Sequence, residues 1–174
     1  RLPGESLRGV YHAKDLVYHY NELPPFSGQV FNIGKRVAII GVGNVMIDIT
    51  HYLLEHHDVE EVTAIARRGP GEIKFDRKEL ESVAANLDVA GFDAEVARAA
   101  DLMRDLGQDP EQPKALVHLA VQKAAPTGSN ARFRLRFLAT PVRILGDEQG
   151  CVRGIEIENN TLVEDKGRAR PIGL

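Results

Sequence analysis

The sequence predicts an α/β protein with a doubly wound parallel β-sheet and a small antiparallel β-meander. Three adjacent segments carry this prediction. Residues 37–40 are a run of apolar β-formers that ends at Gly41, residues 45–56 repeat apolar side chains at helical spacing, and residues 62–66 are a second β-branched run. A strand, a glycine-rich turn, a helix and a second strand form a βαβ unit, in which the two strands are parallel.

The segment before the first strand, residues 1–34, is expected to be a lead-in. Within it, residues 12–20 place apolar side chains on one side of a short helix, and residues 24–34 form a connector that contains Pro and Gly. The core then runs over residues 35–174, and the whole chain is expected to be a single domain. Because residues 37–40 are continuously apolar, we expect the first strand to be covered on both faces.

Helices are expected after the second strand. A loop at 67–75 leads to a helix at about 76–87, whose first residues, Asp-Arg-Lys-Glu, have the form of a capping box. Two further helical stretches follow at 93–106 and 113–124. Residues 132–137 then alternate arginine with apolar residues, which predicts a half-buried strand with a solvated arginine face.

The C-terminal part is expected to contain the meander. Short strands at 142–145 and 152–158, joined by a turn at 147–150, are typical of antiparallel pairing. The residues that follow, 159–174, are polar and weakly patterned, so no element is assigned to them.

Composition limits the classes of partner. The 22 Lys and Arg and 25 Asp and Glu give a formal net charge of −3, without the basic excess needed to bind nucleic acid. No apolar run approaches the roughly 20 residues of a spanning helix, so a soluble protein without membrane contact is expected. The single cysteine, Cys151, cannot form an internal disulfide, which is typical of a reducing, cytoplasmic setting. The sequence begins without Met, which favours a segment of a longer protein.

Gly41-x-Gly43 lies where the first strand turns into the following helix. There Gly41 permits a tight turn, and Gly43 lets the backbone approach a pyrophosphate held by the helix N-terminus. This is the phosphate-binding turn of a Rossmann-like fold, although a glycine-containing turn without a ligand has the same sequence pattern. Met46 occupies the third small position of the motif, so either the helix is displaced or a neighbouring side chain is small.

The end of the second strand decides which dinucleotide fits. An NAD-binding unit usually has Asp or Glu there, about 20 residues beyond the glycines, to bind the ribose 2′-hydroxyl. Here the strand is followed by Arg67 and Arg68, whose guanidinium groups can hold the extra phosphate of NADP. A solvent-exposed basic pair is the alternative interpretation. Together with the glycine turn, the arginine pair favours NADP.

The remaining candidates are weaker. Glu79 can hydrogen-bond a ribose hydroxyl, but its position three residues after Asp76 suits helix capping equally well. His51 and His56 are five residues apart, a poor spacing for one helix face, and no metal site is predicted. No residue is assigned a catalytic role, because no motif for hydride chemistry by the chain alone is present.

Six short segments make the sequence similar to a known family. They are GVGNVMID at 41–48, RRGP at 67–70, KEL at 78–80, PGE at 3–5, YNELP at 20–24 and LRFLATP at 135–141. Together they resemble the NADP domain of adrenodoxin reductase-like ferredoxin–NADP reductases. These are FAD-dependent pyridine nucleotide oxidoreductases, also related to the small subunit of glutamate synthase. The likeness spans nearly the whole chain.

In that family the NADP domain is inserted into an FAD domain that is split in sequence. The resemblance therefore implies that FAD is bound mainly outside these residues, and that electrons pass between NADPH and FAD and on to a ferredoxin or similar iron–sulfur protein. The isolated 174 residues are then expected to bind nucleotide but to be inactive. The alternative is a non-catalytic NADP-sensing module that regulates a partner.

The resemblance also implies roles for individual residues. The pyrophosphate would lie against Gly41, Gly43, Asn44 and Val45, the 2′-phosphate against Arg67 and Arg68, and the adenosine ribose against Glu79. Two features depart from the family. Met46 replaces the usual Ala, and the basic cluster with which animal members bind their ferredoxin is not evident. The natural electron acceptor is therefore left open.

Overall fold

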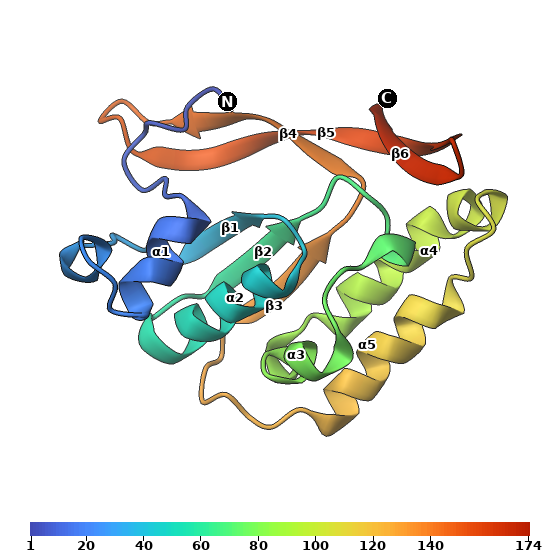
Figure 1. Cartoon of the computed structure of the whole chain (residues 1–174), viewed down its shortest axis with the longest axis horizontal. Coiled ribbons are helices and arrows are strands. Elements are labelled where there is room, and N and C mark those ends of the chain that lie inside the picture. The colour runs from blue at the N-terminus through green and yellow to red at the C-terminus, as the bar shows by residue number, and fades with distance from the viewer.

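The parallel sheet follows from the apolar runs that the sequence contains. A computed structural model describes all 174 residues. It forms this sheet from β1 (Arg36–Ile40), β2 (Glu61–Ile65) and β3 (Arg132–Arg136), in the order β1-β2-β3 (Figure 1). This order is one half of the strand order 3-2-1-4-5-6 that defines the doubly wound fold. The prediction of a parallel sheet with a separate antiparallel sheet is confirmed.

The first crossover contains helix α2 (Asn44–His56), which connects β1 to β2. Its apolar residues recur at helical spacing and five of them, including Met46 and Leu53, are buried. A short N-terminal helix, α1 (Ala13–Tyr20), contacts α2, and the rings of Tyr20 and Tyr52 lie 4.8 Å apart. Both helices agree with the predicted ones to within a residue.

The second crossover contains α3 (Arg77–Glu81), α4 (Val89–Asp105) and α5 (Glu111–Lys123). The predictions of α4 and α5 are confirmed, although both helices begin a few residues earlier than expected. The predicted helix at 76–87 is wrong in its second half. There the chain turns and forms a 3-10 helix, η3 (Ala84–Asn86), because Asp88 starts α4 by capping it through Gly91 N.

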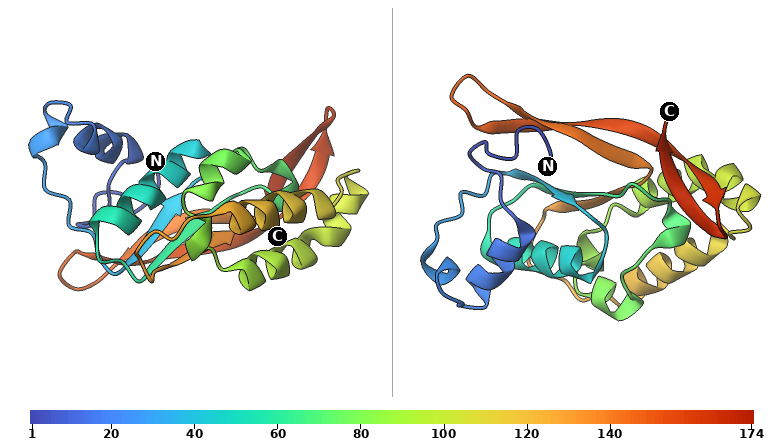
Figure 2. Two further views of the ribbon diagram at one scale, coloured as in Figure 1. Left: turned by 90° about the horizontal axis from the view of Figure 1, so that it is seen from below. Right: turned by 45° about the horizontal axis from the view of Figure 1, so that its top comes forward.

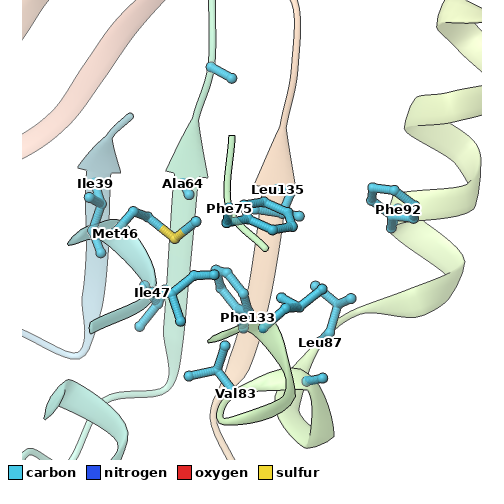
Figure 3. Close-up of a cluster of buried hydrophobic side chains, with 14 of the residues drawn as sticks. Ile39, Met46, Ile47, Ala64, Phe75, Val83, Leu87, Phe92, Phe133 and Leu135 are labelled. Carbon is cyan, nitrogen blue, oxygen red and sulfur yellow. The ribbon is translucent and has the colours of Figure 1, made fainter. Parts of the chain in front are cut away.

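The hydrophobic core lies on one face of the parallel sheet. Residues of α2 pack onto this face, and Phe92 of α4 approaches from beyond β3 (Figure 3). Phe133 on β3 and Val62 on β2 have no exposed surface. The core side chains drawn in Figure 3 include Ile39, Met46, Ile47, Ala64, Phe75, Val83, Leu87, Phe92, Phe133 and Leu135.

The opposite face of the sheet is not covered by a helix at β1. Ile40 is 54% exposed, and Ala38 is exposed as well. The expectation that β1 is covered on both faces is therefore wrong, because a short apolar run does not reveal how many faces are buried. On β3 the outward arginines are partly exposed, as predicted, but they are also paired. Arg132 lies 3.2 Å from Glu61, and Arg136 lies 2.9 Å from Glu95.

The antiparallel sheet consists of β4 (Ala139–Gly146), β5 (Val152–Asp165) and β6 (Arg168–Gly173). Strand β5 pairs with β4 up to Asn159 and with β6 from Asn160 onward. The parallel strands point toward this sheet (Figure 1), and the β5–β6 hairpin extends past the end of the parallel sheet in both views of Figure 2.

The sequence pattern did not reveal the second half of the antiparallel sheet. No strand is predicted for residues 159–174, yet they complete β5 and form β6. Lys166 and Gly167 both have positive φ, 52° and 75°, and Asp165 pairs with Arg168. A two-residue loop with two positive φ angles is the turn that joins tightly paired antiparallel strands. Only Gly167 of this loop readily adopts a positive φ, so the sequence carries a weak signal for the hairpin.

The N-terminal residues pack beside the antiparallel sheet. Ile144 N donates to Pro3 O at 2.8 Å, and Val152 N donates to Arg8 O at 2.9 Å. Gly4, with φ of +88°, lies so close to Ile144 that a methyl group there would be 2.3 Å from its carbonyl oxygen, which leaves room only for glycine. None of the helices combines the length and the apolar composition that crossing a membrane requires.

Candidate nucleotide-binding site

The register of the parallel sheet brings the glycine turn and the arginine pair together. Ile40 pairs with Ile65 at the carboxyl ends of β1 and β2. Gly41 and the residues after Ile65 therefore leave the sheet side by side, at the edge where open α/β sheets bind ligands. Gly41 N also donates to Ile65 O at 2.9 Å. Two motifs that are more than 20 residues apart in the sequence thus form one surface.

The backbone requires glycine at only one of the two glycine positions of the turn. Gly41 has a φ of +124°, which other residues adopt only with strain. Gly43 has a φ of −103°, which any residue can adopt. A methyl group at either position would meet no atom within 4 Å. The fold itself therefore requires glycine at 41 but not at 43, and the open space over Gly43 suits close approach by a ligand.

The N-terminus of α2 offers hydrogen-bond donors to that space. No side chain caps the helix at Gly43, and the N–H groups of Asn44 and Val45 have no acceptor within the chain. Val45 is 53% exposed, but its side chain is apolar, so this residue can bind a phosphate only through its backbone N–H group. Free N–H groups at the positive end of a helix dipole favour a bound phosphate.

Met46 fits into the core because its neighbour is small. Its side chain is 3% exposed and extends over β2, where the core residue is Ala64 (Figure 3). Thr50 donates to the carbonyl oxygen of Met46 at 2.8 Å, as expected within an intact helix turn. Of the two alternatives for the missing small residue, the small neighbour agrees with the structure.

The two arginines differ in their partners. Both are exposed. Arg68 Nη1 lies 3.2 Å from Glu72 Oε2, so this cation is already paired. The Arg67 side chain makes no ion pair and no hydrogen bond, and only its backbone carbonyl oxygen has a partner. Arg67 is therefore the guanidinium that is free to bind an anion beside the glycine turn.

Glu79 is held near the glycine turn by a chain of two contacts. Asn44 Oδ1 accepts a hydrogen bond from Asp76 N at 3.2 Å, which ties the glycine turn to the start of α3. Asp76 Oδ1 in turn accepts from Glu79 N at 3.0 Å and caps the helix. Because Asp76 N donates to Asn44, the reciprocal contact of a capping box is not formed. The exposed carboxylate of Glu79 has no partner in the chain and is available to a ligand.

Two polar residues of the site surroundings were missed by sequence reasoning. Glu72 is the partner of Arg68, and its spacing of four residues was a visible signal. Asn160, 3% exposed, donates through Nδ2 to Arg67 O at 3.0 Å. It lies in the segment to which no element was assigned, so no sequence signal connected it to Arg67.

The histidines do not form a metal centre. His51 and His56 lie 3.1 and 3.7 Å from Glu55, and no group of three or more potential ligands is close enough to hold a metal ion. Burial raises the pKa of Tyr20, and the carboxylate of Asp48 raises it further. Neither feature lies among the residues expected to bind the nucleotide.

Two hollows of the structure lie away from the candidate site. A hollow of about 350 Å³ lies between α4 and α5, lined by residues such as Asp93 and Lys114. A second, of about 310 Å³, lies beside β3 and includes Arg134. Neither includes the glycine turn or Arg67, so the candidate site is identified by its chemistry and by its position at the strand ends.

Comparison with known proteins agrees with this geometry. The sequence is 32% identical to an NADPH-ferredoxin reductase, FprA, of Mycobacterium leprae over 96% of the chain. It is 24% identical over 95% of the chain to a probable mitochondrial NADPH:adrenodoxin oxidoreductase of Dictyostelium discoideum. The chain is a homologue of these reductases. It spans 41% and 39% of their lengths, respectively. No protein-family model matches the sequence.

A solved structure extends the similarity to three dimensions. Mycobacterium tuberculosis FprA in complex with NADPH matches the fold with a TM-score of 0.73 and 27% identity. The match covers 99% of this chain and 43% of that one. The α/β fold and the reductase resemblance derived from the sequence are thereby confirmed.

Proposed function

We propose that the chain is the NADP(H)-binding domain of an FAD-dependent reductase of the ferredoxin–NADP reductase type. The domain comprises all of residues 1–174, with 1–34 as a lead-in and 35–174 as the nucleotide-binding core. The homology to NADPH-ferredoxin and adrenodoxin reductases supports this function, as does the match to a structure in complex with NADPH.

The observation that carries the proposal is the unpaired Arg67 beside the glycine turn. An NAD-binding unit would have a free carboxylate at this strand end. The acidic residue nearest in sequence to the arginine pair, Glu72, is bound to Arg68 instead. The strand end therefore offers a net positive charge, which suits a 2′-phosphate and not a lone 2′-hydroxyl.

The remaining contacts suit the rest of the nucleotide. The N–H groups of Asn44 and Val45 are free to bind the pyrophosphate, and the open space over Gly43 admits it. The unpaired carboxylate of Glu79 is available to a ribose hydroxyl. These contacts hold and orient NADPH, which supplies a hydride when bound.

The hydride acceptor in this proposal is FAD, bound mainly outside these residues. The chain offers no side chain for hydride chemistry at the proposed site, so its role is to bind and orient the nucleotide. The electrons would then pass to a ferredoxin or similar iron–sulfur protein, in line with the names of the homologues. A non-catalytic NADP-sensing module is the alternative, and no observation on the chain favours it over the reductase.

Calorimetric titration of the purified protein with NADP and with NAD tests the proposal. NADP should bind more tightly, and Arg67→Ala should lose about 10- to 100-fold in NADP affinity, because a charge-assisted contact contributes about 1.5–3 kcal/mol. Arg36→Ala is the control, since Arg36 is 80% exposed and begins β1 at the opposite edge of the sheet. Equal affinity for the two nucleotides in the unsubstituted protein would contradict the proposal.

A further inference from the structure

We infer that Asn160 is a positioning residue for NADP specificity, which holds the backbone of Arg67 in place from the antiparallel sheet. This inference rests on the proposed function, since it concerns the same phosphate-binding arginine. It also gives the antiparallel sheet a role in nucleotide selection, although none of its residues is expected to contact the nucleotide.

The first evidence is the burial and bonding of the Asn160 side chain. Asn160 is one of only two buried polar residues of the chain and is 3% exposed. Its Nδ2 lies 3.0 Å from Arg67 O, across 93 positions of sequence. A buried carboxamide is costly to desolvate unless its donors and acceptors are paired. Here the pairing partner is the backbone of the residue that is left free to bind an anion.

The orientation of the carboxamide is fixed by the carbonyl oxygen of Arg67. The Thr140 hydroxyl lies 2.9 Å from Asn160 Oδ1 and 2.8 Å from Nδ2, and it can donate or accept a hydrogen bond. The carbonyl oxygen of Arg67 can only accept, so Nδ2 must face it. A flipped amide would place two acceptors against each other.

The hydrogen bond to Arg67 O is the middle one in a row of three, which bind three consecutive carbonyl groups. Ala139 N donates to Ala66 O, Asn160 Nδ2 donates to Arg67 O, and Leu138 N donates to Arg68 O, each at 3.0 Å. The outer two donors are backbone groups that most residue types would supply. The central donor is a side chain, so only this contact depends on the identity of the residue.

Packing of Gly69, two residues after Arg67, also holds this loop in place. Gly69 is buried against the antiparallel sheet, where a methyl group would lie 3.3 Å from Leu162 and 3.7 Å from Leu138. Both leucines are buried, at 4% and 3% exposed. The loop after β2 is therefore fixed on one side, while the Arg67 side chain extends from it without a partner.

This arrangement links Asn160 to specificity and not to folding alone. The direction of the Arg67 side chain depends on the peptide plane whose carbonyl oxygen Asn160 binds. Misplacement of a binding group by about 1 Å is enough to weaken its contact severely. Loss of the Asn160 contact should therefore weaken the binding of a 2′-phosphate by Arg67. NAD lacks this phosphate, and the contacts to the parts that NAD and NADP share should be unchanged.

The experiment compares Asn160→Leu with a matched control, Asn86→Leu, in the purified protein. Asn86 has the same kind of role elsewhere, because its Nδ2 donates to Ser129 O and Ala131 O at 2.9 Å, beside the amino end of β3. Calorimetry with NADP and NAD and thermal melting are measured for both variants. We expect Asn160→Leu to lower the ratio of NADP to NAD affinity about 10-fold, the lower end of one charge-assisted contact. Asn86→Leu should melt earlier but keep the ratio.

The outcomes separate the two proposals. A ratio that Asn160→Leu leaves intact, or equal losses for NADP and NAD, would overturn the role of Asn160 alone. No preference for NADP in the unsubstituted protein would overturn the proposed function and this inference with it. If Asn160→Leu does not fold, Thr140→Val gives the decisive measurement. It leaves the carboxamide in place but removes the only partner of the buried Asn160 Oδ1, which weakens the hold of Asn160 on Arg67 O. It should therefore lower the ratio about 3-fold, within the range of one neutral hydrogen bond, and an unchanged ratio would overturn the inference.

Discussion

Arg67 and Arg68 are adjacent in sequence but differ in their partners, so replacing each by alanine should have different effects. Arg68 Nη1 lies 3.2 Å from Glu72 Oε2, and the Glu72 side chain is only 11% exposed. Its other oxygen, Oε1, is buried and has no partner. In Arg68→Ala this largely buried carboxylate loses its cation, whereas Arg67→Ala removes a side chain that has no partner in the chain.

The size of the effect follows from the exposure of the pair. Breaking a fully buried ion pair costs about 3–5 kcal/mol, and exposed pairs contribute about 0.2–1 kcal/mol. Arg68 is 47% exposed and Glu72 is 11% exposed, so we expect Arg68→Ala to cost about 1–2 kcal/mol after allowing for solvent screening. At about 2–4 °C per kcal/mol for a chain of this length, Tm should fall by about 2–8 °C. Arg67→Ala should melt like the unsubstituted protein.

Glu72 also competes with the nucleotide for Arg68. Glu72→Gln frees this guanidinium and removes a negative charge beside the 2′-phosphate. NADP affinity should therefore rise about 2- to 5-fold, in keeping with the free energy of a partly exposed ion pair. NAD affinity should stay constant. The double substitution Arg68→Ala, Glu72→Gln should recover most of the stability that Arg68→Ala loses, because no unpaired charge remains.

Calorimetry and thermal melting on the four variants check this reasoning. Arg132→Ala is a suitable control, since Arg132 is also paired with a mostly buried carboxylate, Glu61, but lies at the amino end of β3. It should lower Tm without changing nucleotide affinity. The reasoning would be refuted by an Arg68→Ala variant with an unchanged Tm, or by weaker NADP binding in Glu72→Gln.

Three further predictions follow from the site and its surroundings. Glu79→Gln should weaken NADP binding with Tm unchanged, because Asp76 and not Glu79 provides the capping side chain; a variant that melts early but binds normally would restore the capping interpretation. The isolated 174 residues should be colourless and should not oxidise NADPH with ferricyanide even when free FAD is added, and turnover by them would show that the hydride chemistry lies in this chain. Burial and the neighbouring His56 and His19 lower the pKa of His57 from 6.5, so the unfolded state binds more protons near that pH and Tm should fall as the pH drops below about 6.5. His57→Gln should flatten that dependence, and an equally steep dependence in the variant would contradict the assignment.

The part of the fold that sequence reasoning predicted is the part set by local pattern. The glycine turn between an apolar run and a periodic helix defined β1, α2 and β2 within a residue at each end. The same pattern placed Gly41 and Arg67 at neighbouring strand ends, because parallel strands share a carboxyl edge. Local chemistry was sufficient for this half of the site.

The features that were missed depend on contacts between distant segments. The uncovered face of β1 depends on where the helices pack, which the apolar run does not encode. The continuation of β5 and its hairpin to β6 rests on polar residues whose strand geometry comes from pairing. Asn160 is buried only because that pairing carries it against the loop after β2. Its burial could not be inferred from a polar segment.

The row of three anchored carbonyl groups has a consequence for the entropy of binding. Fixing the backbone of a residue costs about 1–2 kcal/mol of conformational entropy. In a flexible loop, this cost would lower the affinity for the ligand. The carbonyl groups of Ala66 and Arg67 are already bonded to the antiparallel sheet in the absence of nucleotide, and that of Arg68 is bonded to Leu138, directly before the sheet. Only the side chain of Arg67 remains to be ordered, at about 0.5–1.5 kcal/mol. The antiparallel sheet thus shifts the cost of ordering the loop from nucleotide binding to the folding of the domain.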